Sequence, residues 1–139
     1  MIRFVAASLA FFVLAAPAFA VEFEPNDQGF TEFNMPSGNI GCTYTPKGGT
    51  SVYQPVDGGP ELLCDRVAPS YVRIILGPTG KAVLHKDVGD ASCCSAEPVL
   101  AYGKEWTAGP FTCKATTKGL TCGRGENGFV MSRSRLKVY

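Results

Sequence analysis

The residues best suited to chemistry cluster in the segment His85-Lys86-Asp87-Val88-Gly89-Asp90. His85 is the only histidine of the chain, and Asp87 and Asp90 add two carboxylates beside it. An imidazole near two carboxylates can bind a cation or act as a general base. One hypothesis is therefore a small secreted hydrolase or metal-dependent enzyme centred on these three residues. The alternative, which we favour, is that His85 lies on a strand and the aspartates shape a turn.

The sequence carries no other signature of catalysis or metal binding. A serine hydrolase needs a serine activated by a base and an orienting acid. The chain has no Gly-x-Ser-x-Gly segment, and Ser37 in Pro36-Ser37-Gly38 is predicted to be a turn residue. No pair of cysteines has the spacing of zinc ligands, and no glycine-rich segment has the context of a phosphate-binding loop. We therefore expect neither a metal nor a cofactor.

Six cysteines, all after residue 20, favour three disulfides, for which fifteen connectivities are possible. The spacing around Cys113 and Cys122 suggests one pair. Phe111, Cys113 and Ala115 alternate with polar residues, which predicts a half-buried strand. A four-residue loop, 116–119, returns the chain so that Cys113 lies opposite Cys122. Opposed residues in an antiparallel pair have Cα atoms about 4.5–5.5 Å apart, which a disulfide can bridge.

The pairing of the other four cysteines is predicted from the segments in which they lie. Cys42 and Cys64 lie on predicted strands at 39–45 and 61–67, and we expect them to pair. Cys93 and Cys94 are adjacent, and a bond between neighbours can act as a redox or conformational switch. The alternatives are a purely structural clasp, or a bond from one of them to a distant cysteine. A redox function is disfavoured because no Cys-x-x-Cys segment is present, and we expect Cys93 and Cys94 to be bonded to each other.

The rest of the chain predicts an all-β domain. Further strands are expected at 50–54, 71–76, 81–86 and 99–106, the last interrupted at Gly103. A turn at 77–80 would place Val72 opposite His85 and Ile74 opposite Val83. No segment shows a sustained 3.6-residue apolar stripe, and turn residues recur about every 8–12 positions. The prediction is a small, mainly antiparallel β-sandwich or barrel stapled by disulfides.

The first twenty residues have the pattern of a secretory signal peptide. Arg3 precedes an apolar run at 4–16, and Ala18-Phe19-Ala20 forms a small-x-small cleavage site. The run is too short to span a bilayer comfortably, and no other run is longer. We expect cleavage near Ala20 and a single β domain at 21–139, ordered from about residue 30. The product is expected to be a monomer, secreted or periplasmic.

The net charge of the chain restricts the classes of partner that we expect. Without Arg3 the chain has 12 basic and 12 acidic residues, so the expected mature chain carries no net charge. A neutral chain argues against nucleic acid as the main partner. The charges are uneven, however, because the start of the mature chain is acidic and its end is basic.

The basic end has a predicted geometry. If 129–139 is extended, Arg133, Arg135 and Lys137 share parity and project to one side. Lys114 and Lys118 belong to the outward side of the adjoining hairpin. The resulting stripe is either a solvated edge that deters strand pairing or a contact for an anionic envelope surface or an acidic partner.

Two further surfaces could bind a partner. Trp106, Tyr102 and Phe111 could line a ligand groove, although such residues more often fill a core. The loop 55–60, with Asp57-Gly58-Gly59, could be presented by an inhibitor of a secreted enzyme. The absence of catalytic motifs favours a non-enzymatic exported module that binds another macromolecule or the envelope, with the enzyme and the inhibitor as alternatives.

Several segments together resemble a known family. They are Phe33-x-Met35-Pro36-Ser37-Gly38-Asn39-Ile40-Gly41-Cys42, Leu100-x-Tyr102-Gly103, Phe111-x-Cys113, Gly119-x-x-Cys122 and Gly128-Phe129-x-x-Ser132-Arg133. This order is similar to that of a family of short secreted bacterial proteins of unknown function. The resemblance implies an exported bacterial protein and brings no activity or catalytic residue. Many members have a mid-chain cysteine near an Asp-Trp-Gly motif, whereas this chain has Cys93 and Cys94 side by side.

Overall fold

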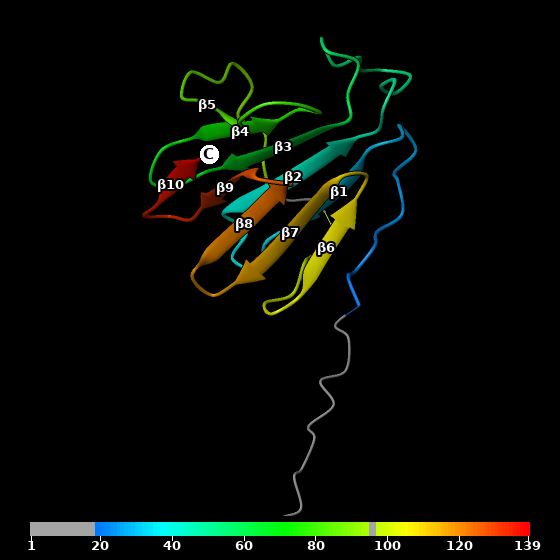
Figure 1. Ribbon diagram of the computed structural model, residues 1–139. Helices are drawn as coiled ribbons and strands as arrows, with labels where there is room; N and C mark the ends of the chain where they lie inside the picture. The colour runs from blue at the N-terminus through cyan, green and yellow to red at the C-terminus, as the bar shows by residue number, and fades with distance from the viewer. Residues whose placement is uncertain (1–18, 95–96) are drawn as a thin grey trace, which may run out of the picture.

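Short stretches of alternating apolar and polar residues build ten strands, which form two five-stranded antiparallel sheets (Figure 1). The computed structural model describes residues 19–94 and 97–139, so residues 1–18 of the predicted signal peptide lie outside the described residues. None of the described residues is helical. The all-β prediction is confirmed, and the two sheets stay separate instead of closing into one barrel.

Both sheets are meanders, in which each strand pairs with its neighbour in sequence. The first contains β1 (Thr31–Asn34), β2 (Ile40–Thr45), β3 (Glu61–Arg66), β4 (Val72–Leu76) and β5 (Val83–His85). The second contains β6 (Glu105–Ala108), β7 (Phe111–Thr116), β8 (Gly119–Arg124), β9 (Asn127–Met131) and β10 (Leu136–Val138). Because hairpin turns make these connections, except for the longer β2–β3 loop, the turns gather at the two ends of the sandwich.

The inner faces of the two sheets pack into one hydrophobic core. Trp106 is fully buried, and its ring centroid lies 4.9 Å from that of Phe33. Tyr44 packs edge-on against Trp106 and, at 6.0 Å, against Phe111. Trp106 and Phe111 therefore belong to the core, and only Tyr102 of the predicted aromatic groove is exposed.

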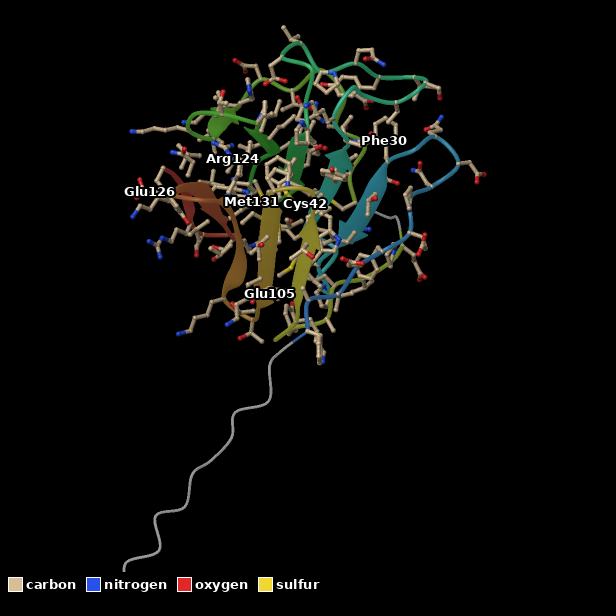
Figure 2. All side chains as sticks on the ribbon, turned by 45° about the vertical axis from the view of Figure 1, so that its right-hand side comes forward. Phe30, Cys42, Glu105, Arg124, Glu126 and Met131 are labelled. Carbon is tan, nitrogen blue, oxygen red and sulfur yellow. A yellow bond between two sulfur atoms is a disulfide. The ribbon has the colours of Figure 1, made fainter. Side chains whose placement is uncertain are left out.

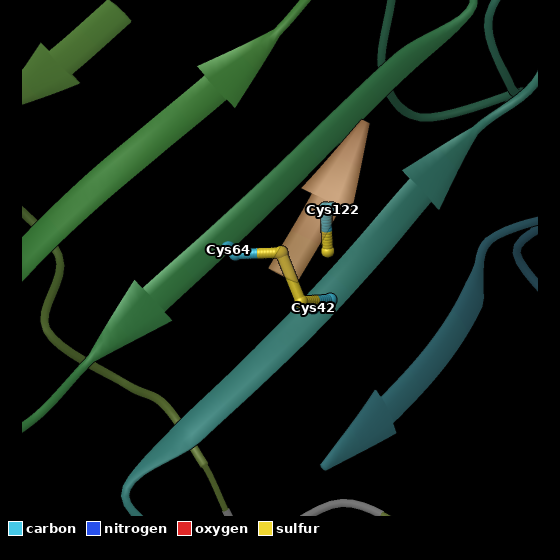
Figure 3. A group of neighbouring side chains, drawn as sticks. All are labelled: Cys42, Cys64 and Cys122. Carbon is cyan, nitrogen blue, oxygen red and sulfur yellow. A yellow bond between two sulfur atoms is a disulfide. The ribbon is translucent and has the colours of Figure 1, made fainter. Parts of the chain in front are cut away.

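Two disulfides lie at the centre of this core. Cys42–Cys64 joins β2 to β3 and Cys113–Cys122 joins β7 to β8, each with its Cα atoms 4.1 Å apart. The Sγ atoms of Cys42, Cys64 and Cys122 lie within 4.8 Å of one another, so the two bonds meet between the sheets (Figure 3). Both predicted pairings are present. Since these sulfurs are oxidised, the group is a structural clasp and not a set of metal ligands.

The β7–β8 hairpin has the predicted register, with Ala115 opposite Leu120. Gly119 has a φ of +136° at the end of its turn, which favours glycine. A Cβ at this position would also lie 2.7 Å from the backbone oxygen of Met131. Glycine is therefore needed here both for its conformation and for the close approach of β9.

The β4–β5 hairpin differs from its prediction by one residue. His85 lies opposite Arg73, not Val72, and Val83 likewise moves by one position along β4. The connection between the strands spans six residues, 77–82, instead of the predicted four, 77–80, and the pairing shifts by one residue. Because a shift of one residue exchanges the two faces of a strand, Leu84 now packs on the core while Val83 is 52% exposed.

Three predicted strands are altered or absent. Residues 50–54 form a loop in which the Thr50 amide donates to the Tyr53 carbonyl oxygen. In 99–106, Val99 forms only an isolated parallel bridge to Asn34, and the chain turns at Gly103 before Glu105 and Trp106 begin β6. The segment 129–139 is not one extended strand, since a turn at 132–135 folds β10 back onto β9.

Contacts outside the two sheets hold the start of the described chain against β6 and join the second sheet to the β4–β5 turn. Val21 forms an isolated parallel bridge with Trp106, so backbone pairing begins earlier than residue 30. Arg124 of β8 donates to the carbonyl oxygens of Gly77 and Gly80, which ties the second sheet to the β4–β5 turn (Figure 2). No helix able to cross a bilayer occurs among the described residues.

Candidate functional site

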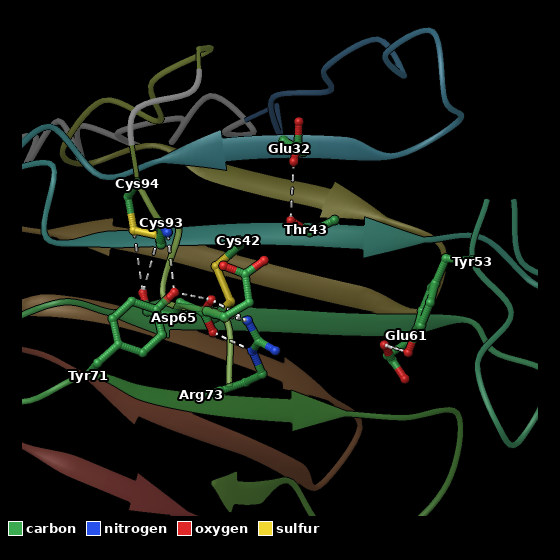
Figure 4. A network of polar contacts seen from close by, with 12 residues as sticks. Glu32, Cys42, Thr43, Tyr53, Glu61, Asp65, Tyr71, Arg73, Cys93 and Cys94 are labelled. Atoms are coloured by element: carbon green, nitrogen blue, oxygen red, sulfur yellow. Dashed lines mark hydrogen bonds and ion pairs between the residues drawn. A yellow bond between two sulfur atoms is a disulfide. The ribbon is translucent and has the colours of Figure 1, made fainter. Parts of the chain in front are cut away.

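Buried ionisable side chains gather on the outer face of the first sheet. A cleft of about 600 Å³ opens there, which we call the face cleft. Its floor comes from β1 to β4, with Tyr53 near one end and the Cys93–Cys94 disulfide near the other (Figure 4). The charged, aromatic, hydroxyl and cysteine side chains that line the cleft include Phe30, Glu32, Thr43, Tyr53, Glu61, Asp65, Arg73, Asp90, Cys93 and Cys94.

A charged pair occupies one end of the face cleft. Asp65 is 5% exposed, and its two carboxylate oxygens accept hydrogen bonds from Arg73 Nε at 2.7 Å and Nη2 at 2.8 Å. The Tyr71 hydroxyl donates to the same carboxylate at 2.6 Å. The hydrogen bonds with Asp65 raise the pKa of Arg73, and burial with the Asp65 bond raises the pKa of Tyr71. The register aligns Asp65 with Arg73 on adjacent strands, so this pair is fixed by the sheet.

The Cys93–Cys94 disulfide rests on this pair. The Cys93 amide donates to the Tyr71 hydroxyl at 3.3 Å, and the two Sγ atoms lie 4.0 and 3.9 Å from the Asp65 carbonyl oxygen. The disulfide sits where Gly41 leaves room on β2. A Cβ on Gly41 would lie 2.8 Å from Cys93 Sγ, closer than real contacts allow. The bond between the neighbouring cysteines is the one expected from the sequence, and it closes one end of the face cleft.

A second carboxyl is buried near the other end. Glu61 is 7% exposed, and its Oε1 accepts a hydrogen bond from the Tyr53 hydroxyl at 2.9 Å. Burial raises the pKa of Glu61 above its ordinary 4.5, although the Tyr53 hydrogen bond opposes this. Burial and the bond to Glu61 together raise the pKa of Tyr53 to about 12. A positive charge entering the cleft would favour the ionised form of Glu61.

Aromatic rings and a third carboxylate flank Glu61 in the face cleft. The rings of Phe30 and Tyr53 lie 6.4 Å apart at an angle of 40°. Glu32 accepts a hydrogen bond from Thr43 at 3.5 Å. The cleft thus combines π faces, which attract cations, with carboxylates.

The face cleft is acidic overall. Its charged lining residues are Glu32, Glu61, Asp65, Asp90 and Arg73. Arg73 pairs with Asp65, and the other carboxylates form no ion pair within the described residues. This arrangement is suited to holding an organic cation between an aromatic wall and a carboxylate.

A second cleft, of about 660 Å³, lies at the end of the sandwich where the β1–β2, β7–β8 and β9–β10 turns meet. We call it the end cleft. Its lining includes Ser37, Tyr102, Lys118 and Arg133, and none of the described residues that line it is an aspartate or glutamate. The two clefts therefore carry opposite charge.

The three residues of the alternative enzyme hypothesis do not form a compact cluster. His85, Asp87 and Asp90 are all exposed, and within the described residues they do not form a group of ligand atoms within 4.8 Å. His85 lies across from Arg73 on the sheet. Only Asp90 lines the face cleft, where its carbonyl oxygen accepts a hydrogen bond from Arg73 at 3.5 Å.

The predicted basic stripe divides into separate groups. The turn at 132–135 removes the shared parity of Arg133 and Arg135 with Lys137, so that part of the prediction was wrong. Lys114 and Lys137 lie in one row across the outer face of the second sheet, separated by Thr121 and Val130. Lys118 and Arg133 instead line the end cleft.

Sequence reasoning missed the residues that make the face cleft. Asp65 and Arg73 have opposite charge and take outward positions in neighbouring strands, so a correct β3–β4 register would have paired them. Tyr53 was placed in a strand that does not exist, and no local pattern links it to Glu61. The signal for Glu61 was a carboxylate at the edge of an apolar run, Glu61-Leu62-Leu63.

Comparisons with known proteins assign neither a family nor a function to this chain. No protein family, curated protein or solved structure matches this chain.

Proposed function

We propose that this protein is an exported, non-enzymatic binding module whose face cleft takes a small organic cation, an amine or guanidinium group on a partly apolar body. The observation that carries the proposal is the buried carboxyl of Glu61, held by Tyr53 inside an acidic cleft. Cation–π attraction is strongest where the ring and the charge are shielded from water. A volume of about 600 Å³ falls in the range of small-molecule sites.

Export is part of the proposal. The signal-peptide pattern at 1–20 and three disulfides within 42–122 fit an oxidising compartment. A rigid disulfide-stapled sheet also suits binding, because a preformed site loses less entropy when a ligand enters.

Calorimetric titration with two matched probes tests the binding site. Phenethylamine carries an aromatic body and a cation, whereas 2-phenylethanol has the same body without charge. We expect the amine to bind and the alcohol to bind at least tenfold more weakly. Glu61→Gln should weaken amine binding about tenfold, which corresponds to roughly 1.4 kcal/mol. The matched control is Glu126→Gln in the exposed β8–β9 turn. Equal binding of both probes would contradict the proposal.

His85→Ala separates this proposal from the enzyme alternative. His85 does not line the face cleft, so amine affinity should stay unchanged in the variant. The enzyme alternative requires a hydrolytic activity that His85→Ala abolishes while the fold is intact. The inhibitor alternative stays a prediction, and it requires inhibition of a secreted enzyme that is lost when Asp57 is replaced by Ala.

A further inference from the structure

The end cleft collects positive charge without carboxylates. Lys118 comes from the β7–β8 turn and Arg133 from the β9–β10 turn, and both are exposed. The sole ion pair in residues 19–94 and 97–139 is that of Arg73 with Asp65. Neither cation of the end cleft is therefore neutralised by an acidic side chain of the described chain.

A third cation lies beneath the cleft. Arg66 ends β3 and is only 4% exposed. Its Nη1 donates to the carbonyl oxygens of Ser132 and Arg133, at 3.1 and 3.4 Å, and its Nη2 donates to Ser70 O and Oγ at 3.2 and 3.3 Å. Its Nε has no hydrogen-bond partner among residues 19–94 and 97–139. Burial lowers the pKa of Arg66, and the nearby charge of Arg133 lowers it further.

These contacts leave Arg66 with a buried charge that only neutral oxygens solvate. Buried charges are usually paired, because an unpaired ion in a poorly solvated site is costly. The carbonyls that Arg66 binds belong to Ser132 and Arg133, which line the end cleft. An anion in the cleft would thus lie beside Arg133 and over Arg66, where it offsets both charges.

The other residues that line the end cleft indicate what else the ligand must contain. The hydroxyls of Tyr102, Thr117 and Ser134 can donate to oxyanion oxygens. Val67 is 40% exposed and adds apolar surface, and a volume of about 660 Å³ is much larger than one inorganic oxyanion needs. The ligand that fits is an oxyanion attached to an organic body.

We propose that the end cleft binds a phosphate-bearing ligand, with Lys118 and Arg133 as its direct partners and Arg66 as a buried counter-charge. Phosphate matches the cleft because it carries up to two negative charges and several acceptor oxygens, and because arginine and lysine are its usual partners. The phosphate group could belong to a free small molecule or to a lipid headgroup. This site is separate from the face cleft and does not depend on the function proposed for it.

Titration with phenyl phosphate tests the site. We expect saturable binding at low ionic strength that weakens as salt rises, since the exposed partners are screened over about 10 Å at 0.1 M salt. The double variant Lys118→Ser/Arg133→Ser should bind at least tenfold more weakly. The matched control is Lys47→Ser/Lys81→Ser, two exposed lysines that line neither cleft. No binding, or equal binding by both double variants, would overturn the proposal.

Two further measurements identify the source of the phosphate group and test the role of the buried Arg66. Retention on vesicles of phosphatidic acid in phosphatidylcholine, lost in Lys118→Ser/Arg133→Ser, would assign the phosphate to a headgroup. Phenyl phosphate binding without vesicle retention would assign it to a free ligand. Arg66→Met should weaken phenyl phosphate binding although Arg66 does not line the cleft. If that variant does not fold, the melting temperature decides: phenyl phosphate should raise it in the native chain and in the control variant, but not in Lys118→Ser/Arg133→Ser.

Discussion

The face cleft and the end cleft differ in how their charges are held. In the face cleft, strand register places Asp65 opposite Arg73, and a hydrogen bond fixes Glu61 to Tyr53. In the end cleft, turns carry Lys118 and Arg133, and no acidic residue lines the site. The face cleft thus contains an ion pair that two adjacent strands build, whereas the end cleft carries exposed cations on turns, which solvent or a ligand must satisfy.

The same contrast separates Arg73, which is partly exposed, from Arg66, which is buried. Arg73 shares its charge with Asp65 through two hydrogen bonds of 2.7 and 2.8 Å. Arg66 lies deeper, yet it binds only carbonyl and hydroxyl oxygens. Arg73 can therefore be explained as a structural pair, while Arg66 lacks a counter-charge within the described chain.

Loss of a core disulfide should damage both clefts together. Replacing Cys113 and Cys122 by Ser should lower the free energy of unfolding by roughly 2–5 kcal/mol, mainly because the unfolded chain is no longer constrained. Urea unfolding of the variant, and of the native protein with and without reductant, measures this. An unchanged midpoint after full reduction of the thiols would show that the disulfides do not hold the sandwich.

Asp65→Asn should damage the face cleft alone. The change leaves Arg73 without its carboxylate, and Arg73 is partly exposed, with 26% of its side-chain surface accessible. Because water can solvate part of the freed guanidinium, we expect a loss of about 1–3 kcal/mol, less than for a fully buried pair. Urea unfolding gives the loss, with the exposed Asp57→Asn as control. Phenyl phosphate binding at the end cleft should not change; a parallel loss there would show that the clefts are coupled.

Opening the Cys93–Cys94 bond should cost less than opening a core disulfide. A bond between neighbouring residues closes almost no chain, so its loss to two serines should change the free energy of unfolding by less than about 1 kcal/mol. Amine affinity at the face cleft should nevertheless change, because the bond packs on Gly41 beside Asp65. A drop in melting temperature as large as that for Cys113 and Cys122 would refute this ranking.

Glu61→Gln should change how the free energy of unfolding varies with pH more than it changes that free energy at low pH. Burial raises the folded pKa of Glu61 above 4.5, so the folded state binds its proton more tightly than the unfolded state does. Native stability should therefore fall as pH rises from 4.5 through the folded pKa. The amide keeps an acceptor for Tyr53 and has no proton to lose, so that fall should vanish. Melting curves between pH 4 and 8 measure it, and an identical profile in native and variant chains would contradict the role given to Glu61.

The same titration distinguishes the clefts. Amine affinity at the face cleft should weaken as pH falls through the pKa of Glu61, because the protonated carboxyl no longer attracts a cation. The lining of the end cleft, as far as the described residues go, contains no carboxyl group. Phenyl phosphate binding should therefore change only as the phosphate itself is protonated. A calorimetric titration of each probe at pH 5 and pH 7 compares the two responses.

The local features of this protein follow from its amino-acid sequence. The alternation in 111–116, the short loop and the spacing of Cys113 and Cys122 specified that hairpin and its register. Period-2 patterns and turn residues likewise specified an all-β chain, and two strands with inward cysteines specified the Cys42–Cys64 pair. Each of these follows from interactions between residues close in sequence, or from strand faces that the alternation fixes.

The tertiary structure alone decided where the functional side chains meet. A slip of one residue moves a side chain to the other face of a sheet, and the β4–β5 hairpin shows that such a slip is not visible in the turn sequence. The turn at 132–135 sent Arg133 to the end cleft instead of a basic stripe. Tyr53 reaches Glu61 from an irregular loop, and Arg66 reaches the β9–β10 turn from the opposite sheet. These contacts depend on how two sheets stack and how long each loop is, which no local pattern encodes.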